Sequence, residues 1–171
     1  MVSLRSECGV SLIQNTNLLF DTQYFFAPVS ATSAERKRWF AELYQQAQAC
    51  ELVFLDPDNG LEVKSRPYGR KLSEKYVYWR EVEALWRGGK SLLLFQYFAR
   101  ENRAAFIQRK SQALAEAAPG AEVEAFCTAH VLFLLALQPG HQAFRQPIIR
   151  QVQEGWEGQI RYAGEVGLGL M

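Results

Sequence analysis

A short polar segment, residues 56–62, carries the densest group of side chains that could do chemistry in this sequence. Its carboxylates and amide, which could take part in proton transfer or in ligand binding, belong to Asp56, Asp58, Asn59 and Glu62. Pro57 fixes its own φ and Gly60 permits a positive φ, so the chain can turn sharply and direct these groups into one cleft. Such residues also form plain polar turns by hydrogen bonding to nearby backbone, and that alternative stays open.

The spacing of these carboxylates bears on two kinds of metal site. A calcium-binding EF-hand loop is excluded, because it needs glycine and glutamate where this segment, counted from Asp56, has Leu61 and Pro67. A magnesium-dependent nuclease of the PD-(D/E)xK type would use Asp58 and Glu62 as metal ligands and Lys64 to position the attacking water. The two halves of that motif lie too close together here to span a turn and a second strand. The nuclease therefore ranks third, after the two functions given at the end of this section, and we expect no metal.

The elements that must position this segment indicate an α/β protein. Helical spacing of apolar residues predicts helices over residues 33–49, 74–86, 102–117 and 141–153, with a kink at Pro147. Apolar runs predict buried strands over residues 52–55, 91–97, 123–127 and 131–137, while residues 1–30 predict short strands or irregular structure. The alternation predicts a mainly parallel sheet between two helical layers, and the short connection before residue 131 predicts an antiparallel hairpin at the sheet edge.

The predicted sheet brings two further polar residues to the same place. Gln96 and Tyr97 end the second buried strand, and open parallel sheets bind ligands beyond the carboxyl ends of their strands. We therefore expect these two side chains to line a cleft together with Pro57, Gly60 and Glu62.

The composition is that of a globular domain, with 171 residues, 49% hydrophobic and 22% charged. We expect one domain over residues 1–171, with a loose tail from about residue 160. Its three cysteines, Cys8, Cys50 and Cys127, are odd in number and far apart, which excludes a disulfide framework and a CxxC zinc site and favours the cytoplasm. The longest apolar run, residues 131–137, is far below the roughly 20 residues that a membrane helix needs.

Charge is distributed unevenly along the chain, although the net charge is only +1. Residues 66–110 carry eleven basic and four acidic side chains, so the remainder of the chain is net acidic. Basic residues beside Tyr76, Tyr78 and Trp79 could form a surface for phosphate contacts and base stacking on nucleic acid. The helical spacing of these aromatic residues favours core packing, and the charges also fit ordinary solvated helices. The candidate phosphate-binding residues are Arg66, Arg70, Lys71, Lys75, Arg100 and Arg103.

The polar segment resembles a motif of the class I methyltransferases that act on amino groups of nucleic acids. Asp56 and Pro57 match the first half of their (D/N)PP(Y/F) tetrad, while Asp58 and Asn59 replace its second proline and its aromatic residue. In that family the acidic residue and a carbonyl accept hydrogen bonds from the target amine, and the aromatic residue stacks on a flipped base. The resemblance implies a Rossmann-like fold and catalytic roles for Asp56, Asp58 and Asn59, without the usual stacking residue.

A longer stretch, roughly residues 38–100, is similar to an uncharacterised bacterial family of Rossmann-like proteins. The resemblance is carried by residues 56–62, 75–79 and 89–100, and it brings no established activity. The methyltransferase resemblance implies S-adenosylmethionine as cofactor, but the glycine-rich turn that holds it has no counterpart, because Gly9 is the only glycine before Gly60. We therefore expect an N-terminally shortened sheet whose exposed first edge favours self-association.

Two functions from different classes follow. The first is S-adenosylmethionine-dependent methylation of nucleic acid, and the alternative is a non-catalytic module that retains the fold and binds nucleic acid or protein. Binding of the cofactor would distinguish them.

Overall fold

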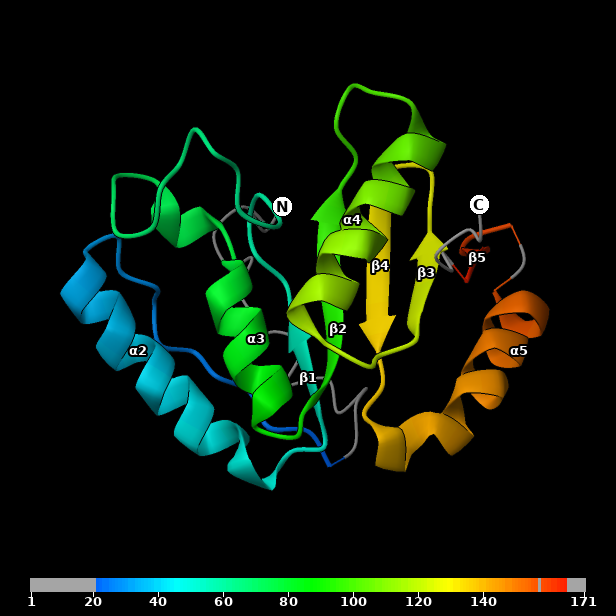
Figure 1. Ribbon diagram of the computed structural model, residues 1–171, viewed down its shortest axis with the longest axis horizontal. Coiled ribbons are helices and arrows are strands. Elements are labelled where there is room, and N and C mark those ends of the chain that lie inside the picture. Colours follow the sequence, from blue (N-terminus) through cyan, green and yellow to red (C-terminus); the bar gives the residue numbers. More distant parts are fainter. Residues whose placement is uncertain (1–20, 157, 166–171) are drawn as a thin grey trace, which may run out of the picture.

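A computed structural model describes residues 21–156 and 158–165 as an open five-stranded mixed sheet with four α-helices (Figure 1). The helices are α2 (Ser33–Gln46), α3 (Trp79–Arg87), α4 (Arg103–Ala117) and α5 (Arg145–Gly155), with short 3-10 helices η1 (Ala47–Ala49), η2 (Ser73–Lys75) and η3 (Pro139–Phe144). The strands are β1 (Leu52–Leu55), β2 (Ser91–Tyr97), β3 (Val123–Cys127), β4 (Val131–Ala136) and β5 (Arg161–Glu165). The predicted α/β class is confirmed at this level.

The strand order is β1-β2-β4-β3-β5, so the last strand of the β3–β4 hairpin lies inside the sheet and not at its edge. Strand β1 pairs with β2 in parallel, with Leu55 opposite Leu94. Strand β4 is antiparallel to both β2 and β3, and β5 is antiparallel to β3. A mainly parallel sheet is not confirmed, because β4 inserts between two strands that run the same way and β5 adds one more antiparallel pair.

Strands β1, β2 and β3 nevertheless run in the same direction. β1 is parallel to β2, and both β2 and β3 are antiparallel to β4. The carboxyl ends of these three strands therefore lie together at one end of the sheet (Figure 1). We call this end, which runs across the strands, the carboxyl edge. The segments that follow them, including the polar segment after β1 and the loop into α4, lie at this edge.

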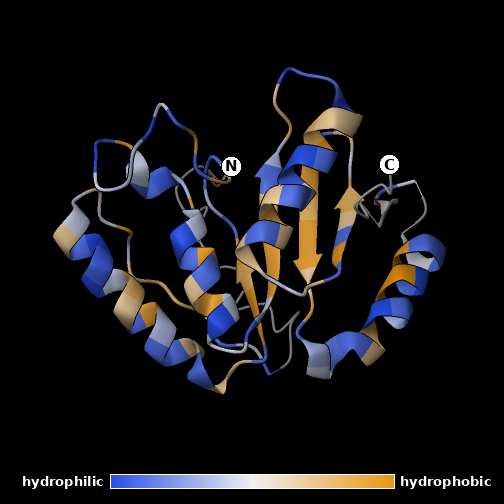
Figure 2. Cartoon of the chain, in the orientation of Figure 1, coloured by the Kyte–Doolittle hydropathy of each residue, from blue (hydrophilic) through white to orange (hydrophobic). Residues whose placement is uncertain are grey.

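The larger core lies between one face of the sheet and helices α3 and α4. Val82 and Leu85 of α3 and Leu114 of α4 are fully buried there, against Leu92 and Leu94 of β2. Figure 2 shows the same division, with apolar strands and helices that are polar on their outer sides. This arrangement buries alternate residues of each strand on the helix-covered face.

The second face of the sheet is covered unevenly. Helix α5 places Ile149 against Phe126 and Leu135, so β3 and β4 are covered there. Over β1, Leu52 and Phe54 are 47% and 50% exposed. Of the two expected helical layers, the second thus covers only part of the sheet within the described residues.

Several predicted elements differ in detail. The helix predicted over residues 74–86 divides into η2 and α3, because Tyr78 is extended and serves as the N-cap of α3. The helix predicted over 141–153 divides into η3 and α5, with Pro147 in the first turn of α5, where a missing N–H is tolerated. Residues 161–165 of the expected loose tail form β5, and residues 166–171 lie outside the described residues.

The N-terminal expectations are tested only in part. Short strands expected within residues 1–20 lie outside the described residues, and residues 22–30 contain neither helix nor strand. Among the helices that the structure describes, none combines the length and apolar character needed to cross a bilayer.

Candidate functional site

The polar segment forms a tight turn whose second half is fixed to the sheet. Gly60 has a φ of +92°, and its N–H donates to the carbonyl of Pro57 at 3.3 Å. Leu61 is buried, and its N–H donates to Oε1 of Gln96 at 2.8 Å. The predicted cleft residue Gln96 is thus buried and supports the turn from β2 instead of facing solvent.

Backbone pairing also joins this turn to the segment before α3. The N–H of Asn59 donates to the carbonyl of Lys75 at 2.9 Å, and the N–H of Glu62 donates to Val77 at 2.8 Å. Val77 in turn donates to the carbonyl of Gly60 at 3.1 Å. These bonds close residues 64–75 into a loop, which we call the basic loop, and hold both of its ends at the carboxyl edge.

The predicted catalytic side chains Asp56, Asp58 and Asn59 are exposed at this edge. Partial burial raises the pKa of Asp56, and the negative charge of Asp58 raises it further. Asp58 itself lies 3.7 Å from Nζ of Lys75, an exposed ion pair of small energetic weight. The turn therefore presents two neighbouring carboxylates and an amide to solvent. Within the described ranges, no three side chains of metal-ligating type gather into a group.

Glu62 interacts with groups on two helices. Burial raises its pKa, the backbone of Trp79 lowers it by hydrogen bonding, and the charge of Glu81 raises it. Lys110 also acts on Glu62, and burial lowers the pKa of Lys110 to about 8. Glu62 therefore interacts with helices α3 and α4, while the electrostatic neighbour of Asp56 is Asp58.

The basic loop is held in place by a buried arginine of α2. Arg36 is 1% exposed and pairs with both carboxylate oxygens of Glu81, at 2.7 and 2.9 Å. It also donates to the carbonyls of Ser73 and Tyr76, at 2.5 and 2.6 Å. The two carbonyls lie in and next to the loop and Glu81 lies in α3, so one guanidinium of α2 joins the loop to α3.

The cationic side chains of the basic loop point outward. Arg66, Arg70 and Lys71 are exposed, and Lys75 is half-buried. Tyr78 is buried, as the core-packing alternative predicts, and its hydroxyl donates to the carbonyl of Arg66 at 2.6 Å. Its ring therefore supports the loop and is not available for base stacking.

A second basic group follows β2. Arg100 and Arg103 are both exposed, and Nη2 of Arg103 donates to the carbonyl of Ala129 at 2.6 Å. The Arg103 guanidinium also lies over the ring of Phe98, 5.0 Å from its centroid. Tyr97 is 49% exposed, and its ring packs edge-on against that of Phe95, with 4.8 Å between the ring centroids. The end of β2 thus carries an exposed aromatic ring, and exposed cations follow it in the chain.

Sequence reasoning missed Arg36 and Lys110 because charged helical residues are ordinarily solvated. A signal existed for Arg36, which lies four residues before Phe40 and seven before Leu43. Those spacings place it on the apolar face of α2.

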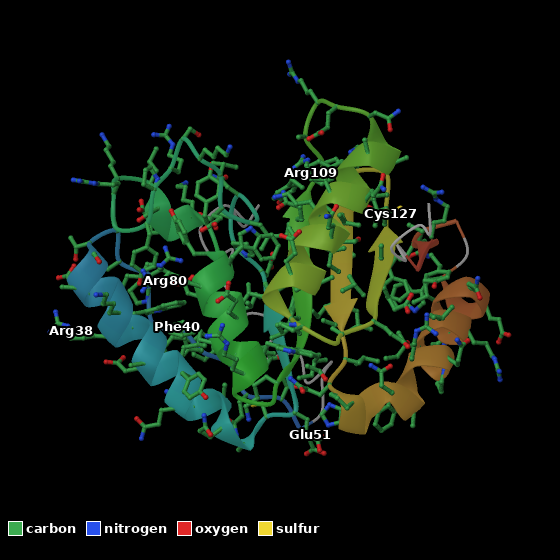
Figure 3. All side chains as sticks on the ribbon, in the orientation of Figure 1. Arg38, Phe40, Glu51, Arg80, Arg109 and Cys127 are labelled. Carbon is green, nitrogen blue, oxygen red and sulfur yellow. The ribbon has the colours of Figure 1, made fainter. Side chains whose placement is uncertain are left out.

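Figure 3 shows Arg38 on α2 and Arg80 on α3. The guanidinium carbon of Arg80 lies 4.5 Å from the ring centroid of Tyr68.

Comparison of the chain with protein-family models, with curated proteins and with solved structures found no match of any of the three kinds.

Proposed function

We propose that this protein binds nucleic acid along the carboxyl edge of its sheet. The observation that carries the proposal is that two basic segments far apart in sequence, the basic loop and the loop leading into α4, lie at the same edge (Figure 1). Together they present Arg66, Arg70, Lys71, Lys75, Arg100 and Arg103. Exposed guanidinium and ammonium groups in this arrangement suit a run of phosphates.

Fixed backbone geometry supports the proposal. Arg36 and the pairing of Asn59 and Glu62 hold the basic loop before any ligand arrives. A preordered loop loses less conformational entropy on binding than a flexible one. The exposed ring of Tyr97 adds a surface on which an unpaired base can stack, which favours a single-stranded ligand.

A second candidate function is methylation of an amino group on that nucleic acid. It is favoured by the exposed position of Asp56, Asp58 and Asn59 directly after β1, where the related tetrad of class I methyltransferases follows its strand. It is also favoured by the antiparallel pairing of β4 with β2 and with β3. A sheet that finishes in an antiparallel hairpin is expected of that fold class. Asp56 and the carbonyls beside it would accept hydrogen bonds from the target amine.

Nucleic-acid binding can be tested by fluorescence anisotropy with a labelled single-stranded oligonucleotide at two salt concentrations. We expect salt-dependent binding that Arg70→Glu with Lys71→Glu weakens by about ten-fold or more, with a smaller salt slope. The matched control is Lys37→Glu with Arg38→Glu, an adjacent exposed pair on α2. Equal loss in the two double variants would overturn the proposal.

Methyl transfer needs a separate measurement. Calorimetry of the full chain with S-adenosylmethionine should show binding if the second candidate is correct. A flat titration together with intact oligonucleotide binding would leave a non-catalytic nucleic-acid module.

A further inference from the structure

A cavity of about 500 Å³ opens where β3 ends and β5 begins. It is bounded by the start of α4, the end of α5 and residues 158–160, and its lining includes Arg103, Cys127, Thr128, Gln153, Arg161 and Tyr162. Figure 3 shows Cys127 at this end of β3. None of the residues of the polar segment or the basic loop lines it.

The side chains that the structure describes around the cavity are positively charged. Of the described residues around the cavity, two are arginines and none carries a carboxylate. Nη2 of Arg103 donates to the carbonyl of Ala129, and Nη2 of Arg161 lies 3.4 Å from Sγ of Cys127. Because a guanidinium has five N–H donors, both arginines keep donors for a ligand. Within the part of the chain that the structure describes, neither arginine forms an ion pair with an acidic side chain.

Neutral polar groups add further donors. The hydroxyl of Thr128 accepts from the N–H groups of His130 and Val131, both at 3.1 Å, so its own hydrogen remains to be donated. Gln153 is also a lining residue, and its amide carries N–H donors. Arg103 is the first residue of α4, and the positive end of that helix dipole therefore points to the same region.

We propose that this cavity binds a phosphate monoester of nucleotide size, with its phosphate held between Arg103 and Arg161. A volume of about 500 Å³ is in the range of small-ligand sites. Two guanidinium forks and a hydroxyl donor match the acceptors of a dianionic phosphate. The remaining lining residues, which include Ile160 and Tyr162, are available to the organic part.

Two sources could supply such a group, a free mononucleotide or the terminal phosphate of a strand. The site is separate from the basic loop, although Arg103 also belongs to the proposed nucleic-acid surface. Arg161 belongs to the cavity alone, so its substitution tests the cavity without altering the basic loop.

The test is calorimetry of the full chain with AMP, adenosine and inorganic phosphate, together with anisotropy of one oligonucleotide with and without a 5′-phosphate. We expect binding of AMP and no binding of adenosine, or a preference for the 5′-phosphorylated strand, and these two results distinguish the sources. Arg161→Gln should weaken the binding of AMP, or of the 5′-phosphorylated strand, by about ten-fold or more. The control Arg150→Gln, at an exposed residue of α5 outside the lining, should not.

Equal binding of adenosine and AMP, or phosphate-dependent binding that Arg161→Gln leaves unchanged, would overturn the proposal. It would also be overturned if neither AMP binding nor a 5′-phosphate preference were found, even where the basic loop still bound oligonucleotides. Arg161→Lys keeps the charge and loses the fork, so it should give an intermediate loss and guards against a folding defect in Arg161→Gln.

Discussion

The side-chain amide of Gln96 occupies the space that a β-carbon at position 60 would need. An ideal Cβ built on Gly60 would lie 2.6 Å from Nε2 and 2.7 Å from Oε1 of Gln96. The same Oε1 accepts the N–H of Leu61. The position of the polar turn is therefore set by a residue of the neighbouring strand, and glycine is required for the approach.

Gly60→Ala should destabilise the fold by about 3 kcal/mol, from the positive φ and from the contact with Gln96. Urea unfolding measures the loss. Gly120→Ala is the matched control, because its φ is +82° and nothing lies within 4 Å of the added carbon. We expect about 1 kcal/mol there. Equal losses at the two positions would show that Gln96 is not the cause.

Arg36→Met should be strongly destabilising, by about 3–5 kcal/mol, because it leaves Glu81 buried without its partner. It also removes the donor to the carbonyls of Ser73 and Tyr76, so amide hydrogen exchange should accelerate in the basic loop. Arg38→Met, at an exposed position of the same helix, should change stability by less than about 0.5 kcal/mol. Unchanged exchange in the loop of Arg36→Met would contradict the role given to Arg36.

Lys110 should make the wild-type protein more stable as pH rises from 8 to 10.5. Burial lowers its pKa from 10.5 to about 8, so the unfolded state binds more protons across this window. The gain amounts to roughly 2–3 kcal/mol. Lys110→Met should remove the gain and be more stable than wild type at pH 7, as measured by urea unfolding at each pH. Lys64→Met, at an exposed lysine, is the control, and a wild-type protein that loses stability relative to Lys110→Met over this window would refute the assignment.

Asp58→Asn should lower the pKa of Asp56, because it removes the neighbouring charge that disfavours ionisation. The pKa should stay above its usual value, since burial is the larger cause. Carboxyl carbon NMR titration reads the shift directly. Glu51→Gln, at the opposite end of β1, should leave it unchanged, and an upward shift in Asp58→Asn would contradict the assignment.

The sequence predicted much of the local structure correctly. The apolar runs of β2 and β3 end at the residues predicted, because each run is bounded by polar or turn residues. β5 was not predicted, since residues 161–165 contain glycine and arginine and acquire strand structure by pairing with β3, as Tyr162 does with Phe126. Residues 161–165 therefore form a strand because they pair with β3, and not because of the pattern of apolar residues in their own sequence.

The candidate site was predicted less well, for a related reason. Exposure of Asp56 and Asp58 follows from their polar turn, which the sequence identified. The burial of Gln96 and the interactions of Glu62 with Trp79 and Lys110 depend on how α3 and α4 pack on the sheet. Such pairings between distant segments leave no periodic signal in one sequence.

The inner position of β4 fixes an order for assembly of the sheet. β3 leaves the ribosome first, yet it joins β2 only through β4, with Leu94 opposite Leu134 and Ala125 opposite the same residue. Until β4 has been synthesised, β2 has an unpaired apolar edge, which is the state most prone to aggregate. A nascent chain that stalls before Val131 is therefore a natural client for chaperones.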